Sequence, residues 1–124
     1  MGTMRFNERD AELLYSFPKP ASDVAIIVRN YTFINRAAPP TYGELASCLI
    51  KALRAGIIRK EGEGFVVAKD WYDRIHKADA AVENEIESLL AFEETFVKIE
   101  FEETTNAASV LSEEEYRWIL TTLR

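Results

Sequence analysis

The sequence predicts a mainly helical α+β domain, and three observations lead to that prediction. Apolar residues recur every three or four positions in several segments, which is the spacing of one helix face. Two sequences of the T/S-x-x-E form, at Thr41 and Ser112, are capping boxes that mark helix starts. Two short β-prone runs joined by "EGEG" predict a hairpin. With 124 residues, 48% of them hydrophobic and 29% charged, the chain has the length and composition of one soluble globular domain.

Two helices are predicted before residue 36. Asn7 can cap the first, and the prolines of "PKP" end it because proline removes a helix hydrogen bond and clashes with the preceding turn. Ser22 is the candidate cap of the second helix, which ends before "AAPP". The apolar faces of the two helices are Ala11, Leu14, Tyr15 and Phe17 in the first, and Val24, Ile27, Val28, Tyr31 and Ile34 in the second.

The third helix has the clearest boundaries, and the hairpin follows it directly. Thr41 begins it, with Glu44 three residues on, so we expect the Thr41 hydroxyl to accept a hydrogen bond from a first-turn N–H group. Gly56 supplies the C-terminal stop. The runs "IIRK" and "FVVA" then form the hairpin. We expect five residues of this unit to be buried together: Leu45, Leu49, Leu53, Ile57 and Phe65.

The remaining chain predicts a long helix, an extended strand and a final helix. Asp70 can cap a helix that runs to Phe92, with apolar positions Trp71, Ile75, Ala78, Val82, Ile86 and Leu89. Alternation in "FVKIEFE" predicts a half-buried strand from Phe96 to Glu102, with Val97, Ile99 and Phe101 on one side. The final helix begins at Ser112 and buries Tyr116, Ile119, Leu120 and Leu123. We therefore expect one domain over 1–124, built from a core at 7–69 and an acidic helix-strand-helix extension at 70–124.

The reactive residues are too few for most enzyme sites. Cys48 is the single cysteine and falls within a helical apolar pattern, which favours a small buried side chain over a nucleophile. His76 is the single histidine, so one chain cannot build a catalytic triad or a cluster of metal-binding histidines. No glycine-rich turn lies between a strand and a helix to hold phosphates. We predict that the protein is not an enzyme and has no metal or cofactor.

The apolar runs also bear on location. None approaches the roughly 20 residues that span a bilayer, and "MGTMRFNERD" contains no apolar signal core. We therefore expect a cytoplasmic protein without membrane contact.

Charge is distributed unevenly along the chain, whose formal net charge is −6. Between Ala25 and Lys77 there are nine basic and five acidic residues, whereas from Asp79 onward there are 12 acidic and three basic residues. This asymmetry is typical of a basic face with an acidic companion surface, and two ordinary solvated surfaces would give it as well.

The order helix, helix, turn, helix, hairpin resembles the winged-helix superfamily, a helix-turn-helix with an appended β-wing. The elements that carry the resemblance are Glu44-Leu45, Leu49, Leu53, Ala55-Gly56-Ile57-Ile58 and Gly64-Phe65-Val66-Val67. The longer stretch "RNYTFINRAAPPTYGELASCLIKALRAGIIRKEGEGFVV" is similar to a group of short, uncharacterised bacterial winged-helix proteins. "LSEEEYRWIL" resembles a helix that ends such chains. The resemblance implies a winged-helix core, with the long helix, strand and final helix as an extension.

The resemblance also implies a position for double-stranded DNA, because DNA-reading members place the helix before the wing in the major groove. Carried over by residue, the contact set would be Tyr42, Gly43, Ser47, Lys51 and Arg54 on the helix, with Arg59 and Lys60 on the wing. Two features oppose this use. Glu61 and Glu63 at the wing tip would repel phosphates, and the basic residues of the helix come late. A solvated helix face without DNA contact stays an alternative of about equal weight.

Two further hypotheses concern protein partners. The winged helix can act as a protein-interaction module without DNA binding, with the acidic C-terminal half meeting a basic partner. The chain can also form a homodimer through Ile75, Val82, Ile86 and Leu89, with the strand at Phe96 to Glu102 covering or pairing with the partner. A monomer in which the strand returns to the wing and the final helix covers the first is the rival arrangement.

Overall fold

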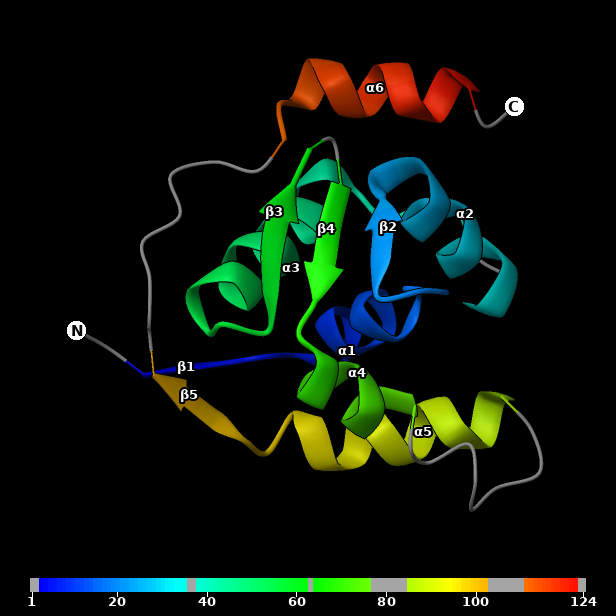
Figure 1. Cartoon of the computed structure of the whole chain (residues 1–124). Coiled ribbons are helices and arrows are strands. Elements are labelled where there is room, and N and C mark those ends of the chain that lie inside the picture. The colour runs from blue at the N-terminus through cyan, green and yellow to red at the C-terminus, as the bar shows by residue number, and fades with distance from the viewer. Residues whose placement is uncertain (1–2, 36–37, 63, 77–84, 103–110, 123–124) are drawn as a thin grey trace.

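The computed structural model describes residues 3–35, 38–62, 64–76, 85–102 and 111–122, and its fold is α+β and mainly helical (Figure 1). No helix in these ranges is both long and apolar enough to cross a membrane. The elements in chain order are β1 (Thr3–Arg5), α1 (Glu8–Tyr15), β2 (Ala21–Asp23), α2 (Val24–Asn35), α3 (Tyr42–Arg54), β3 (Ile58–Glu61), β4 (Gly64–Val67), α4 (Lys69–His76), α5 (Glu85–Phe96), β5 (Glu100–Glu102) and α6 (Glu113–Thr122).

The strands form two small antiparallel sheets. The predicted hairpin is confirmed as β3–β4, and β2 adds to it on the β4 side in the order β2-β4-β3. The second sheet pairs β1 with β5, with Thr3 opposite Glu102 and Arg5 opposite Glu100. The prediction of one strand from Phe96 to Glu102 is wrong in its extent, because Phe96 is the last residue of α5 and only Glu100–Glu102 is extended.

The ends of the helices follow local chemistry. Asn7 and Thr41 each accept a hydrogen bond from the N–H three residues on, and the carboxylates of Asp10 and Glu44 return the interaction. The hydroxyl of Ser112 likewise accepts from Glu115 N–H at 3.0 Å, so both predicted capping boxes are confirmed. These caps satisfy first-turn N–H groups that have no partner within the helix.

The start of α2 and the end of α3 also depend on local residues. Ser22 was the wrong cap for α2: the Asp23 carboxylate accepts from Ile26 N–H at 2.8 Å, whereas the Ser22 hydroxyl donates to the Lys19 carbonyl. At the end of α3, Gly56 has a φ of 77°, and Ile57 N–H donates to the Ala52 carbonyl at 2.9 Å. This is a Schellman stop of the kind that glycine permits.

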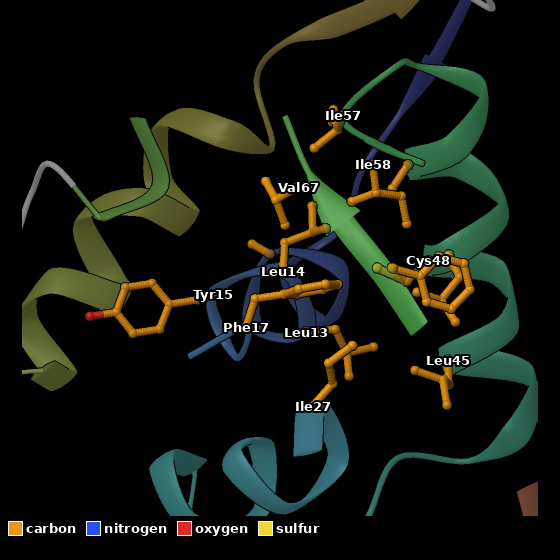
Figure 2. Close-up of a cluster of buried hydrophobic side chains, with 14 of the residues drawn as sticks. Leu13, Leu14, Tyr15, Phe17, Ile27, Leu45, Cys48, Ile57, Ile58 and Val67 are labelled. Atoms are coloured by element: carbon orange, nitrogen blue, oxygen red, sulfur yellow. The ribbon is translucent and has the colours of Figure 1, made fainter. Parts of the chain in front are cut away.

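The main core lies between α1, α2, α3 and the β3–β4 hairpin (Figure 2). Cys48 points from α3 into this cluster, so the expectation of a small buried side chain is confirmed. Of the five residues predicted to be buried together, Leu45, Leu49, Ile57 and Phe65 are buried, and Leu53 is partly buried against them.

Aromatic rings join the C-terminal half to this core. Phe6, next to β1, lies 4.8 Å from Phe96 and 5.0 Å from Phe101 between ring centroids. Trp71 of α4 packs on the same two rings, at 5.9 and 5.3 Å, and Phe92 stacks on Phe96 at 4.8 Å. Trp71 is partly buried and lies at the rim of the core. Residues from β1, α4, α5 and β5 share one hydrophobic cluster with the first half of the chain.

The segment predicted as one long helix is described as two helices, α4 and α5, and residues 77–84 lie outside the described part. Ile75 was predicted to lie on a dimer seam, but its side chain is fully buried within its own chain, where no symmetry mate can reach it. The side chains of Val82, Ile86 and Leu89 lie outside the described residues. The pairing of β5 with β1 also removes the reason to seek a strand partner in a second chain.

Position 64 requires glycine for a steric reason. A Cβ atom there would lie 2.6 Å from the Ser22 carbonyl oxygen and 2.9 Å from the Cα of Asp23. Side chains do not tolerate such approaches to backbone. Gly64 therefore lets β2 come close to β4, which places the start of α2 beside the hairpin.

Candidate interaction surface

The C-terminal segment contacts Tyr42, the first residue of α3. The Tyr42 hydroxyl donates to the Leu111 carbonyl at 2.6 Å, and the Tyr116 hydroxyl of α6 donates to the Pro40 carbonyl at 2.5 Å. The two tyrosine rings lie 6.4 Å apart between centroids. Figure 1 shows α6 crossing the end of the β3–β4 hairpin at its tip. Tyr42, predicted to meet DNA, is thus held by contacts within the chain.

Lys51, also predicted to contact DNA, forms an internal ion pair. Its ammonium group contacts the carboxylate of Asp10, whose side chain is only 3% exposed. The ammonium also lies 5.3 Å from the centroid of the Phe6 ring and 3.4 Å from the Arg5 carbonyl oxygen. A buried carboxylate needs such a partner, because an isolated buried charge is strongly disfavoured. Lys51 thus links α3 to α1, and the predicted contact with a phosphate would compete with this ion pair.

The outward stripe of α3 is nearly uncharged. Gly43 and Ser47 are exposed, Ile50 follows on the same face and is partly buried, and Arg54 ends the stripe. This spacing of three and four residues keeps the four on one face. Ser47 and Arg54 thus occupy the predicted side of the helix, with only one basic residue among them.

Acidic residues lie among the basic residues of the hairpin. The Arg59 guanidinium pairs with the Glu61 carboxylate at 3.4 Å, and both side chains are exposed. Lys60 is exposed and lines a cavity together with Glu115 of α6. Arg36 and Glu63, the other charged residues relevant to this surface, lie outside the described residues. The part of the surface that the structure describes is thus not a continuous basic face.

The cavity beneath α6 has a volume of about 430 Å³. It lies where three parts of the chain meet: the β2–α2 junction, the hairpin near its tip, and α6. The lining residues are Asp23, Val24, Ala25, Lys60, Gly62, Leu111, Glu115, Trp118, Ile119 and Thr122. Trp118 is 70% exposed, an unusual state for the largest apolar side chain. The cavity therefore combines an accessible indole with two carboxylates and one ammonium group.

Burial and neighbouring charges shift the pKa values of several ionisable groups near α3 and α6. Burial raises the pKa of the Tyr116 phenol to about 12, with a smaller contribution from the Glu44 charge, so this hydroxyl stays a donor to Pro40. The hydrogen bond from Thr41 N–H lowers the pKa of Glu44. Burial raises the pKa of the Cys48 thiol well above its usual range, which keeps it protonated and unreactive.

A separate group of carboxylates lies between α1 and α5. Partial burial raises the pKa of Glu93 to about 7, and the charges of Glu12 and Glu8 add to this effect. The pKa of Glu12 is also raised, chiefly by burial, although the nearby Arg9 opposes the shift. Arg9 lies 3.3 Å from the Glu44 carboxylate and 3.8 Å from that of Glu12. The glutamates therefore place negative charges close together at the α1–α5 interface when they are ionised.

The role of α6 was missed from the sequence. Its capping box and apolar stripe predicted a helix, and Tyr116 is buried as expected, with Ile119 and Leu120 partly buried. Leu123 lies outside the described residues. The rival monomer placed this helix over α1, whereas it packs near α2 and the start of α3. The residues of the cavity come from segments far apart in sequence. The one sequence signal for it is Trp118, a large aromatic residue that lies outside the predicted apolar face of this helix.

Comparison of the chain with protein-family models, with curated proteins and with solved structures finds no match.

Proposed function

We propose that this protein is a winged-helix domain that acts as a protein-interaction module and meets a basic partner through the surface around α6. Two features support the winged-helix assignment. The first is the order α1, β2, α2, α3, β3, β4, and the second is the three-stranded sheet in which β2 joins the hairpin. Since one fold hosts many functions, the choice of partner has to come from the surface.

One observation carries the choice of a protein partner over DNA: the C-terminal segment binds Tyr42 in the first turn of α3. In a DNA-reading domain this turn supplies base contacts. Here the Tyr42 hydroxyl donates a hydrogen bond to the Leu111 carbonyl. Three glutamates in the first turn of α6 add negative charge to the same end of the molecule. Phosphates approaching there would be repelled.

The charge of the described surface supports the same choice. Basic side chains are drawn into pairs with acids, as at Lys51–Asp10 and Arg59–Glu61. The exposed acids Glu113, Glu114 and Glu115 lie on the helix that carries the exposed Trp118. Exposed carboxylates on the same helix as an exposed aromatic side chain are complementary to a basic polypeptide segment.

A direct comparison of two ligands tests this proposal. The full-length protein is titrated with a peptide of alternating arginine and glycine, and separately with a random-sequence DNA duplex, in both cases from low to physiological salt. We expect binding of the peptide and no binding of the duplex. Tight duplex binding with a steep loss of affinity in salt, and no peptide binding, would instead support the DNA hypothesis, because that salt dependence reports released counterions.

A further inference from the structure

The two carboxylates of the α6 cavity are held in position before any ligand arrives. Asp23 caps α2 by accepting from Ile26 N–H at 2.8 Å, and Glu115 returns the capping box of α6 by accepting from Ser112 N–H at 3.4 Å. Each carboxylate has a second oxygen beyond the one used in its cap. Because the caps already restrict these side chains, less conformational freedom remains to be lost on binding.

Trp118 and the apolar lining favour a cationic group on an aliphatic stem. A guanidinium over an indole face gains a cation–π interaction and can hydrogen-bond carboxylates with its fixed donors. Leu111 and Ile119 line the same cavity and offer apolar surface for the methylene groups that lead to the charge. A volume of about 430 Å³ is within the range of ligand pockets and suits one long side chain with its flanking backbone.

Lys60 and the N-terminus of α2 act in the opposite direction, since both would attract an anion. Asp23 occupies the cap position of α2, however, and accepts from its first turn. With Asp23 and Glu115 against Lys60, carboxylates exceed ammonium groups among the lining residues. Lys60 is exposed, so water screens its charge.

From these contacts we infer that the α6 cavity binds an arginine side chain of the partner, with the guanidinium stacked on Trp118 and neutralised by Asp23 and Glu115. The inference rests on the proposed function and deepens it, since it names the group that is recognised and the residues that recognise it.

The test follows the indole N–H signals in NMR spectra of the full-length protein during titration with the alternating arginine–glycine peptide. The chain has two tryptophans, so Trp71, which is packed against Phe96 and Phe101, serves as an internal reference. We expect the Trp118 signal to move and the Trp71 signal to stay. The same peptide with citrulline in place of arginine keeps the shape without the charge, and we expect it to leave both signals unmoved.

Two substitutions remove charge and keep the caps. Asp23→Asn and Glu115→Gln retain the oxygen that accepts each capping hydrogen bond, so the helices still begin at the same residues. Together they should weaken peptide binding about tenfold, as expected for two partly exposed charge pairs. Glu114→Gln is the matched control: it removes one charge from an exposed position of the same helix outside the cavity, and affinity should change by less than about twofold. Lys60→Gln should tighten binding.

The outcomes separate this inference from the proposed function. If Asp23→Asn/Glu115→Gln binds the arginine peptide as tightly as the wild type, or if the citrulline peptide binds equally well, the cavity assignment is overturned and the interaction module stands. Peptide binding without movement of the Trp118 signal would likewise overturn the cavity assignment and leave the interaction module standing. If the wild-type protein binds no arginine peptide, both proposals fail.

Discussion

Helices α3 and α6 both begin with a capping box, but they differ in how much of their surface is buried. Each opens with a Thr or Ser whose hydroxyl accepts from the N–H of a glutamate three residues on, and each glutamate returns the interaction. Helix α3 then buries Leu45, Ala46, Cys48, Leu49 and Ala52, whereas α6 buries only Tyr116. A capping box therefore fixes where a helix starts, whereas the apolar face of the helix decides how strongly it is held in the fold.

The largest expected effect is on the core face of α3. Leu49→Ala should lower the free energy of unfolding by about 3 kcal/mol, because it leaves a cavity among side chains that are almost fully buried. Chemical denaturation measures this loss. Leu53→Ala is the matched control on the same helix, and its loss should be clearly smaller because Leu53 is partly exposed. Equal losses would contradict the assigned core face.

Truncation of Tyr116, the one buried side chain of α6, should have the next largest effect. Tyr116→Ala should cost about 2 kcal/mol, less than a large core truncation, because α6 can detach while the rest stays folded. Hydrogen exchange should show loss of protection in α6 and little change in α3. Tyr116→Phe keeps the ring and removes only the hydrogen bond to Pro40, at a cost of about 1 kcal/mol. A cooperative loss of both helices would show that α6 is integral to the core.

The two caps give a sharper contrast. Thr41→Ala should lower global stability by roughly 1 kcal/mol, since α3 cannot fray without opening the core. Ser112→Ala removes an equivalent cap, yet the global loss should be roughly half as large, because fraying of α6 is local. The two melting curves test this ranking, and a larger shift for Ser112→Ala would reverse it.

The smallest effect comes from pH at the α1–α5 interface. The raised pKa of Glu93, about 7 against a usual 4.5, means that the folded protein holds this proton more tightly than the unfolded chain does. Stability should therefore fall as pH rises from 4.5 toward 7 and stay low above that. Glu93→Gln should raise the free energy of unfolding by roughly 0.5 kcal/mol near pH 8, after allowance for solvent screening, and by less at lower pH. A wild-type protein that gains stability toward pH 8 would contradict this sign.

Structural features that depend on residues close together in the sequence were predicted correctly. The caps at Asn7, Thr41 and Ser112, the stop at Gly56 and the β3–β4 hairpin each depend on residues two to five positions apart, and all are present. The apolar stripes of α1, α2 and α3 also face the core, because a helical period describes burial directly.

Pairings across long stretches of sequence could not be read in this way. Strands β1 and β2 have three residues each, too few to show a period. The alternation around β5 predicted a strand but not its partner, because β1 lies far along the chain. The Lys51–Asp10 pair joins residues 41 positions apart, so Lys51 looked like an outward basic residue. The cavity beneath α6 needs three segments at once, and no local pattern predicts it.

The pairing of β1 with β5 has a consequence for the timing of synthesis. Arg5 and its partner Glu100 are 95 residues apart, and Phe6 beside them packs on Phe96. At a translation rate of about 5–20 residues per second, the first strand waits roughly 5 to 20 seconds before its partner has been made. During that interval strand β1 and the Phe6 ring have been made without the residues that they contact in α5 and β5. Strand β1, although made long before β5, therefore reaches its final place only after β5 has been made.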